Sequence, residues 1–178
     1  MIYEFRQYTL HPGVREEFVR LFERHFVESQ EEAGISLVGI FTDLDRPDAF
    51  VWMRAFPDME ARRVALEEFY LRGAAWREHR DAANGMMIDS DDVLLLRLDG
   101  VPVVPGGAGP VEAVVAPAAV EPGGAAVVFE GEHSVNTFPR LPVREGEDVR
   151  LWLGRGLSAP PEALQHLRLL PTSRSPIR

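Results

Sequence analysis

The chain has 178 residues, of which 46% are hydrophobic, a formal net charge of −9, and neither cysteine nor lysine. Without these side chains, thiolate nucleophiles, disulfides, Cys-based zinc sites and lysine Schiff bases are excluded. An acidic chain with no basic stripe predicts no nucleic acid and no anionic membrane as partner. The sequence shows neither an apolar run of ~18 residues nor a signal-peptide pattern, so we expect a cytoplasmic protein.

Four strands are predicted in the first hundred residues. Alternating positions rich in aromatic and β-branched residues predict strands over 2–10, 35–42 and 49–56. A fourth strand is predicted over 92–98, where a continuous apolar run is typical of a strand covered on both faces. The turn cluster at 43–48 joins the second and third strands into a hairpin.

Two helical regions are predicted between these strands. The first begins near Pro12 and ends at Gly34, which is placed as a C′ glycine would be. The second begins at Asp58, a favourable N-cap residue, and a short helix over 74–83 continues it beyond Gly73. The resulting order, β-α-β-β-α-β, is typical of a ferredoxin-like α+β unit.

Both faces of this sheet carry apolar side chains, and exposing either face to water would be unfavourable. A ferredoxin-like sheet carries its helices on one face and leaves the other face bare. Large apolar side chains nevertheless occupy both sides of the first and third strands. The bare face must therefore be covered, either by a second copy of the chain or by the rest of this chain.

Composition divides the chain into three segments. Residues 1–100 predict a ferredoxin-like α/β-barrel domain. Residues 101–125, rich in Gly, Pro, Ala and Val, predict a connection in which 111–115 has the pattern of a strand. Residues 126–178 predict a degenerate second lobe, which is a partial repeat of the first unit.

The second lobe is predicted to consist mostly of strands. With the strand at 111–115, its elements follow the order of the first unit without its first helix. They are strands over 126–137, 148–154 and 167–171, and a short helix over 160–166. The strand that carries Trp152 also resembles the strand that carries Trp52, which favours an internal repeat.

The opening of the chain resembles the NIPSNAP family. Members begin with a Tyr-Glu-Leu-Arg-x-Tyr-x-Leu-x-Pro-Gly pattern, which residues 3–13 match with Phe5 in place of leucine. Supporting matches are Trp76 and the segments 39–41, 52–54 and 167–175. The resemblance implies a dimeric α/β barrel, in which two such sheets pack face to face in a homodimer. It implies no agreed reaction, because such barrels serve many functions.

Two histidines are the predicted catalytic residues. His25 follows the apolar helical spacing, so we expect it to point at the sheet, where an imidazole can act as a base near neutral pH. Glu28 lies three residues on and either orients His25 or is a surface acid. His79 lies three residues after Trp76 and would stabilise negative charge. A core or surface role is the alternative for each histidine.

The predicted substrate pocket lies between the helices and the sheet. Its residues are Phe22, Glu28, Trp52, Arg54, Phe69, Tyr70 and Trp76. Arg6 and Arg54 are expected on neighbouring strands, on the face that carries Glu4. They form a structural ion-pair cluster, or else one arginine holds a substrate carboxylate or enolate. No metal-binding motif occurs, and we expect neither a metal nor an organic cofactor.

Two functions remain open from the sequence. The first is a NIPSNAP-like barrel that binds a small aromatic or polyketide-like metabolite, as a cofactor-independent monooxygenase, cyclase or isomerase. The second is a non-catalytic ligand-binding or assembly module that uses the apolar sheet face as an interface. A ligand-sized cavity with converging polar groups supports the first function, and a filled cleft supports the second.

Overall fold

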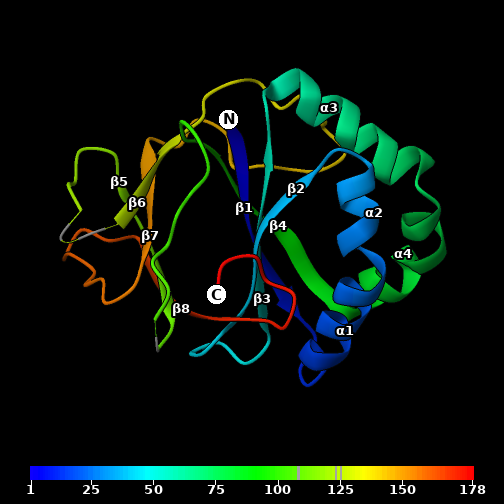
Figure 1. Ribbon diagram of the computed structural model, residues 1–178, viewed down its shortest axis with the longest axis horizontal. Coiled ribbons are helices and arrows are strands. Elements are labelled where there is room, and N and C mark those ends of the chain that lie inside the picture. The colour runs from blue at the N-terminus through cyan, green and yellow to red at the C-terminus, as the bar shows by residue number, and fades with distance from the viewer. Residues whose placement is uncertain (108, 123, 125) are drawn as a thin grey trace.

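The computed structural model describes residues 1–107, 109–122, 124 and 126–178, and its strands close into a barrel (Figure 1). The remaining positions, 108, 123 and 125, fall in the predicted connection and lie outside the described residues. The strands are β1 (Ile2–Leu10), β2 (Ser36–Asp43), β3 (Ala49–Phe56), β4 (Met87–Arg97), β5 (Val111–Pro117), β6 (Ala126–Gly131), β7 (Val149–Gly154) and β8 (Gln165–Pro171). Around the barrel their order is β1-β3-β2-β8-β5-β7-β6-β4.

Helices cover the outer side of one half of the barrel (Figure 1). They are α1 (Arg15–His25), α2 (Val27–Glu32), α3 (Met59–Glu67), the π-helical segment η1 (Glu68–Arg72) and α4 (Ala74–Met86). We call β1–β4 with these helices the first lobe, and β5–β8 the second lobe. In the described part of the chain, the second lobe contains no helix.

The first lobe confirms the predicted β-α-β-β-α-β order. Its strands are antiparallel neighbours in the order β4-β1-β3-β2, as in a ferredoxin-like sheet. The predicted first helix is divided at Phe26 into α1 and α2, and Gly34 follows them with a φ of 87°. Asp58 caps α3, because its Oδ1 accepts the N–H of Ala61 at 2.7 Å.

The second lobe has the same strand order as the first. The order β8-β5-β7-β6 places its four strands as β4-β1-β3-β2 places those of the first lobe. In the strand registers, Trp152 lies opposite Val114 of β5, as Trp52 lies opposite Arg6 of β1. The strand β5 lies inside the segment predicted as a connection.

Two predicted elements of the second lobe are wrong. The helix over 160–166 is absent, since the Leu164 N–H donates to the Val115 carbonyl at 2.8 Å and β8 begins at Gln165. The strand predicted over 126–137 ends at Gly131, and the chain then turns toward the first lobe. A helix of so few residues is costly to nucleate, so pairing with a neighbouring strand wins over it.

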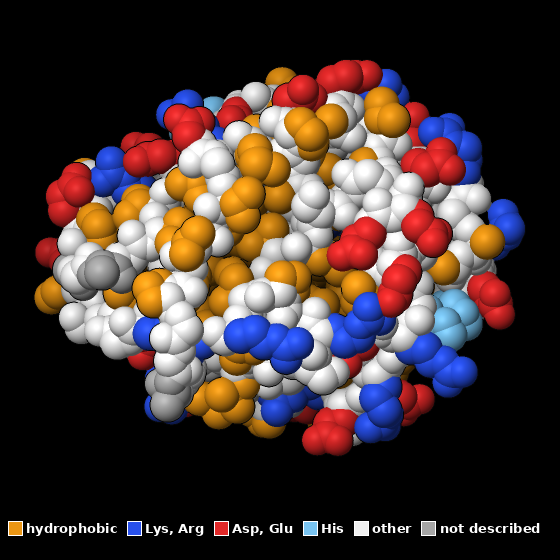
Figure 2. Space-filling model, viewed as in Figure 1, with side chains coloured by type: hydrophobic (Ala, Val, Ile, Leu, Met, Phe, Trp, Pro, Cys, Tyr) orange, Lys and Arg blue, Asp and Glu red, His pale blue; other side chains and the backbone are white. Residues whose placement is uncertain are grey.

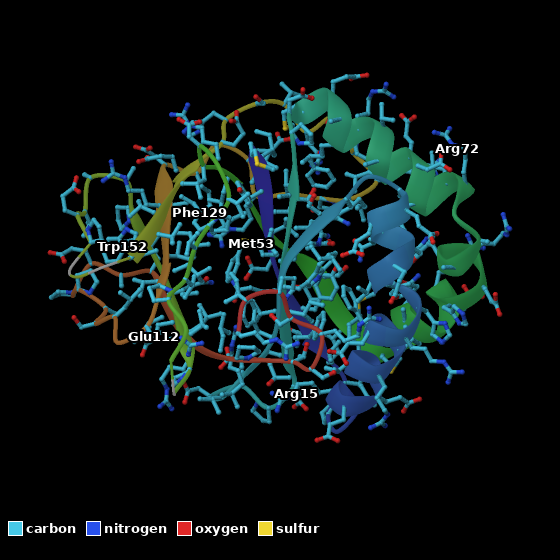
Figure 3. All side chains as sticks on the ribbon, viewed as in Figure 1. Arg15, Met53, Arg72, Glu112, Phe129 and Trp152 are labelled. Atoms are coloured by element: carbon cyan, nitrogen blue, oxygen red, sulfur yellow. The ribbon has the colours of Figure 1, made fainter. Side chains whose placement is uncertain are left out.

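The apolar sheet face that the sequence left uncovered lies inside the barrel. Buried residues of both lobes meet there, among them Tyr3, Phe5, Met53, Phe129 and Leu151. Figure 3 shows Met53 and Phe129 on the interior side of their strands. The rest of the same chain therefore covers this face, and the prediction that it serves as an assembly interface is wrong. That the protein forms a homodimer stays a prediction.

Hydrophobic side chains also gather near the middle of one face of the molecule (Figure 2). A cavity of about 270 Å³ at one end of the barrel is lined by apolar residues such as Leu37, Val38 and Ile177. The hydroxyl of Tyr3, which lines it, already donates to the Gly100 carbonyl. No helix among the described residues is long and apolar enough to cross a membrane. A second cavity, between the helices and the sheet of the first lobe, has a more polar lining and is the stronger candidate for a site.

Candidate functional site

The candidate site is a cavity of about 260 Å³ between the helices and the sheet of the first lobe, which we call the helix–sheet cavity. Its walls are mainly aromatic and consist of Phe18, Phe22, Phe26, Trp52, Phe69, Tyr70 and Trp76. Buried polar lining comes from Arg6, Tyr8 and Gln30. Exposed polar lining comes from Asn84, Asp91 and Arg140. The lining is therefore mainly apolar, with a few buried and a few exposed polar side chains.

The aromatic walls come from helix periodicity on one side and from the sheet on the other. Residues four apart on α1 share one face, which brings the ring of Phe22 to 4.9 Å from that of Trp52. Trp76 of α4 meets the rings of Phe26 at 5.6 Å and Tyr70 at 4.9 Å. These edge-on and tilted contacts fix the ring orientations, so the flat surfaces of the cavity are held in place.

The π-helical segment η1 gives the cavity two neighbouring aromatic residues, Phe69 and Tyr70. A π-helical turn is wider than an α-helical turn and is often found at functional sites. Gly73 directly follows this segment. A Cβ added at Gly73 would lie 2.3 Å from the Phe69 carbonyl oxygen. Glycine is therefore required at this position by close approach of the backbone.

Four charged side chains, each at most 1% exposed, form a cluster of which one member, Arg6, lines the cavity. We call them the guanidinium cluster, which consists of Glu4, Arg6, Arg54 and Arg62. The Oε2 of Glu4 accepts from Arg6 Nη1 at 2.6 Å and from Arg54 Nε at 2.7 Å. Its Oε1 accepts from Arg62 Nε at 2.6 Å. Strand alternation puts Glu4 and Arg6 on one face, and the β1–β3 register places Arg54 opposite Glu4.

The cluster keeps Glu4 ionised. Burial alone would raise the pKa of Glu4, but the positive charges of Arg54, Arg6 and Arg62 outweigh it and hold that pKa well below its ordinary value. A carboxylate with so low a pKa is a poor general base at neutral pH. The part that Glu4 plays is to hold the three guanidinium groups in place.

Two tyrosine hydroxyls connect the guanidinium cluster to the cavity. Tyr8 accepts from Arg6 Nε at 3.0 Å, and Tyr70 accepts from Arg54 Nη1 at 3.2 Å. Burial raises the pKa of Tyr8 despite the nearby charge of Arg6, so this phenol stays protonated at neutral pH. Because each hydroxyl oxygen accepts from an arginine, its own hydrogen is available to donate to a ligand oxygen.

The loop between β6 and β7 brings second-lobe residues to the site. Nη1 of Arg62 donates to the side-chain oxygen of Asn136 at 3.1 Å. The ring of Phe138 stacks on that of Tyr70 with centroids 6.1 Å apart, and residues 140–142 line the cavity. The second lobe therefore both closes the barrel and completes one wall of the site.

Most of the predicted pocket residues meet in this cavity. Those that line it are Phe22, Trp52, Phe69, Tyr70 and Trp76. Arg54 does not line it but lies behind Tyr70, to whose hydroxyl it donates. The placement of Glu28 in the pocket is wrong, because its exposed carboxylate accepts from Arg174 Nη1 at 3.0 Å. Glu28 is thus the surface acid that the sequence left as the alternative.

The two predicted catalytic histidines lie outside the lining of the helix–sheet cavity. The expectation that His25 points at the sheet is wrong, since its ring stacks on that of His79 with centroids 3.7 Å apart. Loss of hydration, with the charges of His79 and Arg24, lowers the pKa of His25. Among the described residues no group of three or more His, Asp or Glu side chains is placed to hold a metal ion.

Several residues of the site were missed from the sequence, among them Arg62, Tyr8 and Gln30. Arg62 lies four residues before Leu66 on the buried face of α3, and this spacing signals a buried arginine. Tyr8 follows Arg6 by two residues on β1, and strand alternation puts them on one face. Gln30 is buried on α2 four residues after the buried Phe26, and the same spacing could have identified it.

Two ferredoxin-like sheets closed into one barrel by a single chain, with a cavity beneath the helices of one sheet, define a two-lobed α/β-barrel protein. The NIPSNAP family profile matches residues 3–99, which is more than half of the chain. The chain belongs to the NIPSNAP family. No curated protein matches the chain by sequence.

Solved structures share the fold at low sequence identity. A NIPSNAP family protein from Agrobacterium tumefaciens is 19% identical, with a TM-score of 0.51 over 57% of this chain and 97% of its own. A NIPSNAP domain protein from Burkholderia xenovorans is 17% identical, with a TM-score of 0.50 over 60% of this chain and 100% of its own. A candidate monooxygenase from Lactobacillus acidophilus is 13% identical, with a TM-score of 0.58 over 96% of this chain and 93% of its own. The last therefore shares both lobes.

Proposed function

We propose that the protein binds a small, flat aromatic molecule in the helix–sheet cavity. The observation that carries this proposal is the aromatic lining, in which Phe22, Trp52, Tyr70 and Trp76 surround a volume of about 260 Å³. Apolar walls with a few converging polar groups are typical of small-molecule sites, and this volume suits a ring system of one or two rings.

The polar lining of the cavity orients the ligand. Tyr8 and Tyr70 each have a hydroxyl hydrogen to donate, and Arg6 lines the cavity between the sheet and α1. The guanidinium cluster holds these donors in place before any ligand arrives. The free-energy cost of reorganising them on binding is therefore small. A ligand oxygen that points toward the sheet meets several donors at once.

The same donors favour reactions that build negative charge on an oxygen atom. Fixed donors in a site that excludes water stabilise an enolate or phenolate oxygen strongly. Oxygenation, cyclisation and isomerisation of a small aromatic or polyketide-like molecule all pass through such an anion. Because the Lactobacillus acidophilus protein is described as a candidate monooxygenase, oxygen uptake with a dihydroxynaphthalene probe is the first reaction to test.

Thermal unfolding with a matched pair of probes tests the binding proposal. 2-Naphthoate and its fully saturated analogue carry the same carboxylate on a flat and a puckered ring. At a hundred times its dissociation constant a ligand stabilises by about 2.7 kcal/mol, which is about 5–10 °C in Tm for a chain of this size. We expect this shift for the naphthoate alone, and an equal response to both probes would contradict the proposal.

A substitution in the wall locates the binding. Trp76→Leu removes a ring that contacts Phe26, Phe69 and Tyr70 and should weaken naphthoate binding about ten-fold. His79→Leu lies three residues further along α4 and outside the cavity lining, so it should leave the affinity unchanged. Equal losses in the two variants would place the ligand elsewhere.

A further inference from the structure

The guanidinium cluster holds more positive than negative charge. Three guanidinium groups surround one carboxylate, that of Glu4, and all four side chains are at most 1% exposed. Their other side-chain hydrogen-bond partners are neutral and consist of Tyr8, Gln30, Tyr70, Asn136 and Thr137. Among the described residues the cluster therefore buries three positive charges against one negative charge.

The residues at the mouth of the cavity do not correct this imbalance. Asp91 and Arg140 both line the cavity and are exposed, and they add one charge of each sign. Removing charges from water is expensive unless a partner of opposite sign and further hydrogen bonds compensate. A surplus of buried positive charge next to an open cavity thus calls for an anion in that cavity.

Donors without partners point to the same conclusion. Nε1 of Trp52, a 1% exposed residue that lines the cavity, donates no hydrogen bond among the described residues. The same holds for Nη2 of Arg62. Buried donors are rarely left unsatisfied in proteins, and donors alone are what an acceptor-only group needs.

We propose that the natural ligand of the helix–sheet cavity is an aromatic carboxylate, whose negative charge offsets the surplus of the guanidinium cluster. This proposal rests on the aromatic-binding function proposed above and names its ligand class. Its carboxylate lies toward Arg6, Tyr8 and Trp52, where a planar guanidinium group and neutral donors suit its two oxygens. Its ring lies between the aromatic walls, toward Tyr70 and Trp76.

An isosteric pair of probes tests the charge of the ligand. 2-Naphthoate and 2-naphthamide differ in charge but share the ring and almost the same shape. We expect calorimetric titration of the full chain at neutral pH to give at least about ten-fold tighter binding for the carboxylate. Equal affinities would overturn the carboxylate assignment and leave the aromatic-binding function standing. Equal affinities for naphthoate and its saturated analogue would overturn the aromatic-binding function and leave the carboxylate assignment standing.

A substitution tests the charge surplus without any ligand. Oε1 of Gln30, a 1% exposed residue that lines the cavity, accepts from Arg54 Nη1 at 3.2 Å. Gln30→Glu adds a carboxylate of the same shape next to the cluster. If the cluster has surplus positive charge, the substitution should raise Tm by about 2–4 °C and abolish the preference for naphthoate over naphthamide. An unchanged or lower Tm, or failure to fold, would overturn the proposal.

The chain offers a matched control at Gln7. This residue is 4% exposed, and its Oε1 accepts from Arg46 Nη2 at 2.9 Å. Arg46 already pairs with Asp43 at 2.7 Å, so this guanidinium group has a carboxylate partner of its own. Gln7→Glu should therefore lower Tm and leave the preference for naphthoate intact. A rise of Tm in both variants would mean that any buried carboxylate is tolerated, which would also overturn the proposal.

Discussion

The two lobes have the same sheet order but differ in what covers the outer face. In both, the third strand carries a buried tryptophan, Trp52 or Trp152, whose Nε1 has no partner among the described residues. In both, the first strand carries a glutamate two residues before the position opposite that tryptophan. These are Glu4 in the first lobe and Glu112 in the second.

The outer faces differ in charge and in cover. In the first lobe, Glu4 is fully buried and binds three arginines beneath the helices. In the second lobe, Glu112 is half-buried and accepts the backbone N–H of Leu157 at 2.9 Å. The position opposite it holds Gly154, where the first lobe has Arg54. Trp152 packs against Val114, Ala116 and Leu157.

The comparison shows how one sheet order serves two purposes. Without buried arginines and without helices, the outer face of the second lobe is a small apolar core that its own connecting segments cover. With them, the outer face of the first lobe holds an open cavity beside buried charge. The second lobe therefore closes the barrel, and the first carries the site.

The largest expected effect distinguishes the two glutamates. Glu4→Gln removes the carboxylate that holds three buried arginines and should lower the free energy of unfolding by about 3–5 kcal/mol. Glu112→Gln weakens one hydrogen bond and should cost about 1 kcal/mol or less. Urea unfolding followed by circular dichroism measures both. Similar losses would show that the guanidinium cluster is no more demanding than the second lobe.

The pH dependence of the Glu4 contribution sharpens this difference. The pKa of Glu4 is lowered in the folded protein, so its contribution is complete above the unfolded value of about 4.3 and is lost as pH falls through the folded value. The stability difference between wild type and Glu4→Gln should be constant from pH 7 to pH 5 and shrink only in stronger acid. A difference that already shrinks at pH 6 would refute the lowered pKa.

The next effect concerns the helical layer that only the first lobe has. Gly73→Ala brings a Cβ to 2.3 Å from the Phe69 carbonyl oxygen and should destabilise by about 1–3 kcal/mol. Gly85→Ala, in the same helix region with no atom within 4 Å of the added Cβ, should be neutral or stabilise by about 0.5–1 kcal/mol. Thermal unfolding compares the two, and equal effects would remove the need for glycine at position 73.

A smaller effect is expected from the indole N–H. Trp52→Phe keeps an aromatic ring but removes the donor that lines the cavity, and should weaken naphthoate binding by about three- to ten-fold. Trp152→Phe makes the same change in the second lobe and should leave the affinity unchanged. Calorimetric titration measures both variants. Loss of affinity in Trp152→Phe alone would show that the ligand binds in the second lobe and not in the first.

The smallest effects are expected at residues that the sequence placed in the site and the structure did not. His25→Ala separates a stacked pair outside the cavity lining, and Glu28→Gln breaks an exposed pair with Arg174. We expect both variants to bind naphthoate as wild type does. A substantial loss of affinity in His25→Ala would return that residue to the candidate site.

Much of the first lobe could be predicted because its signals are local. Strand alternation, the cap at Asp58 and the glycine at position 34 each depend on a few neighbouring residues. The aromatic pocket residues followed from helical spacing in the same way. The helix predicted over 160–166 failed because β8 pairs with β5, far away in the sequence, and such pairing has no local signature.

Three features could be inferred from the residues alone: the ferredoxin-like unit, the need to cover its apolar face, and the aromatic character of the site. The three-dimensional fold was needed to show that the same chain supplies the cover and that Arg62 joins Glu4. It was also needed to show that the loop carrying Asn136, 74 residues from Arg62, completes the cavity wall. Burial and charge balance depend on contacts between distant segments, whereas periodicity and caps depend on neighbours alone.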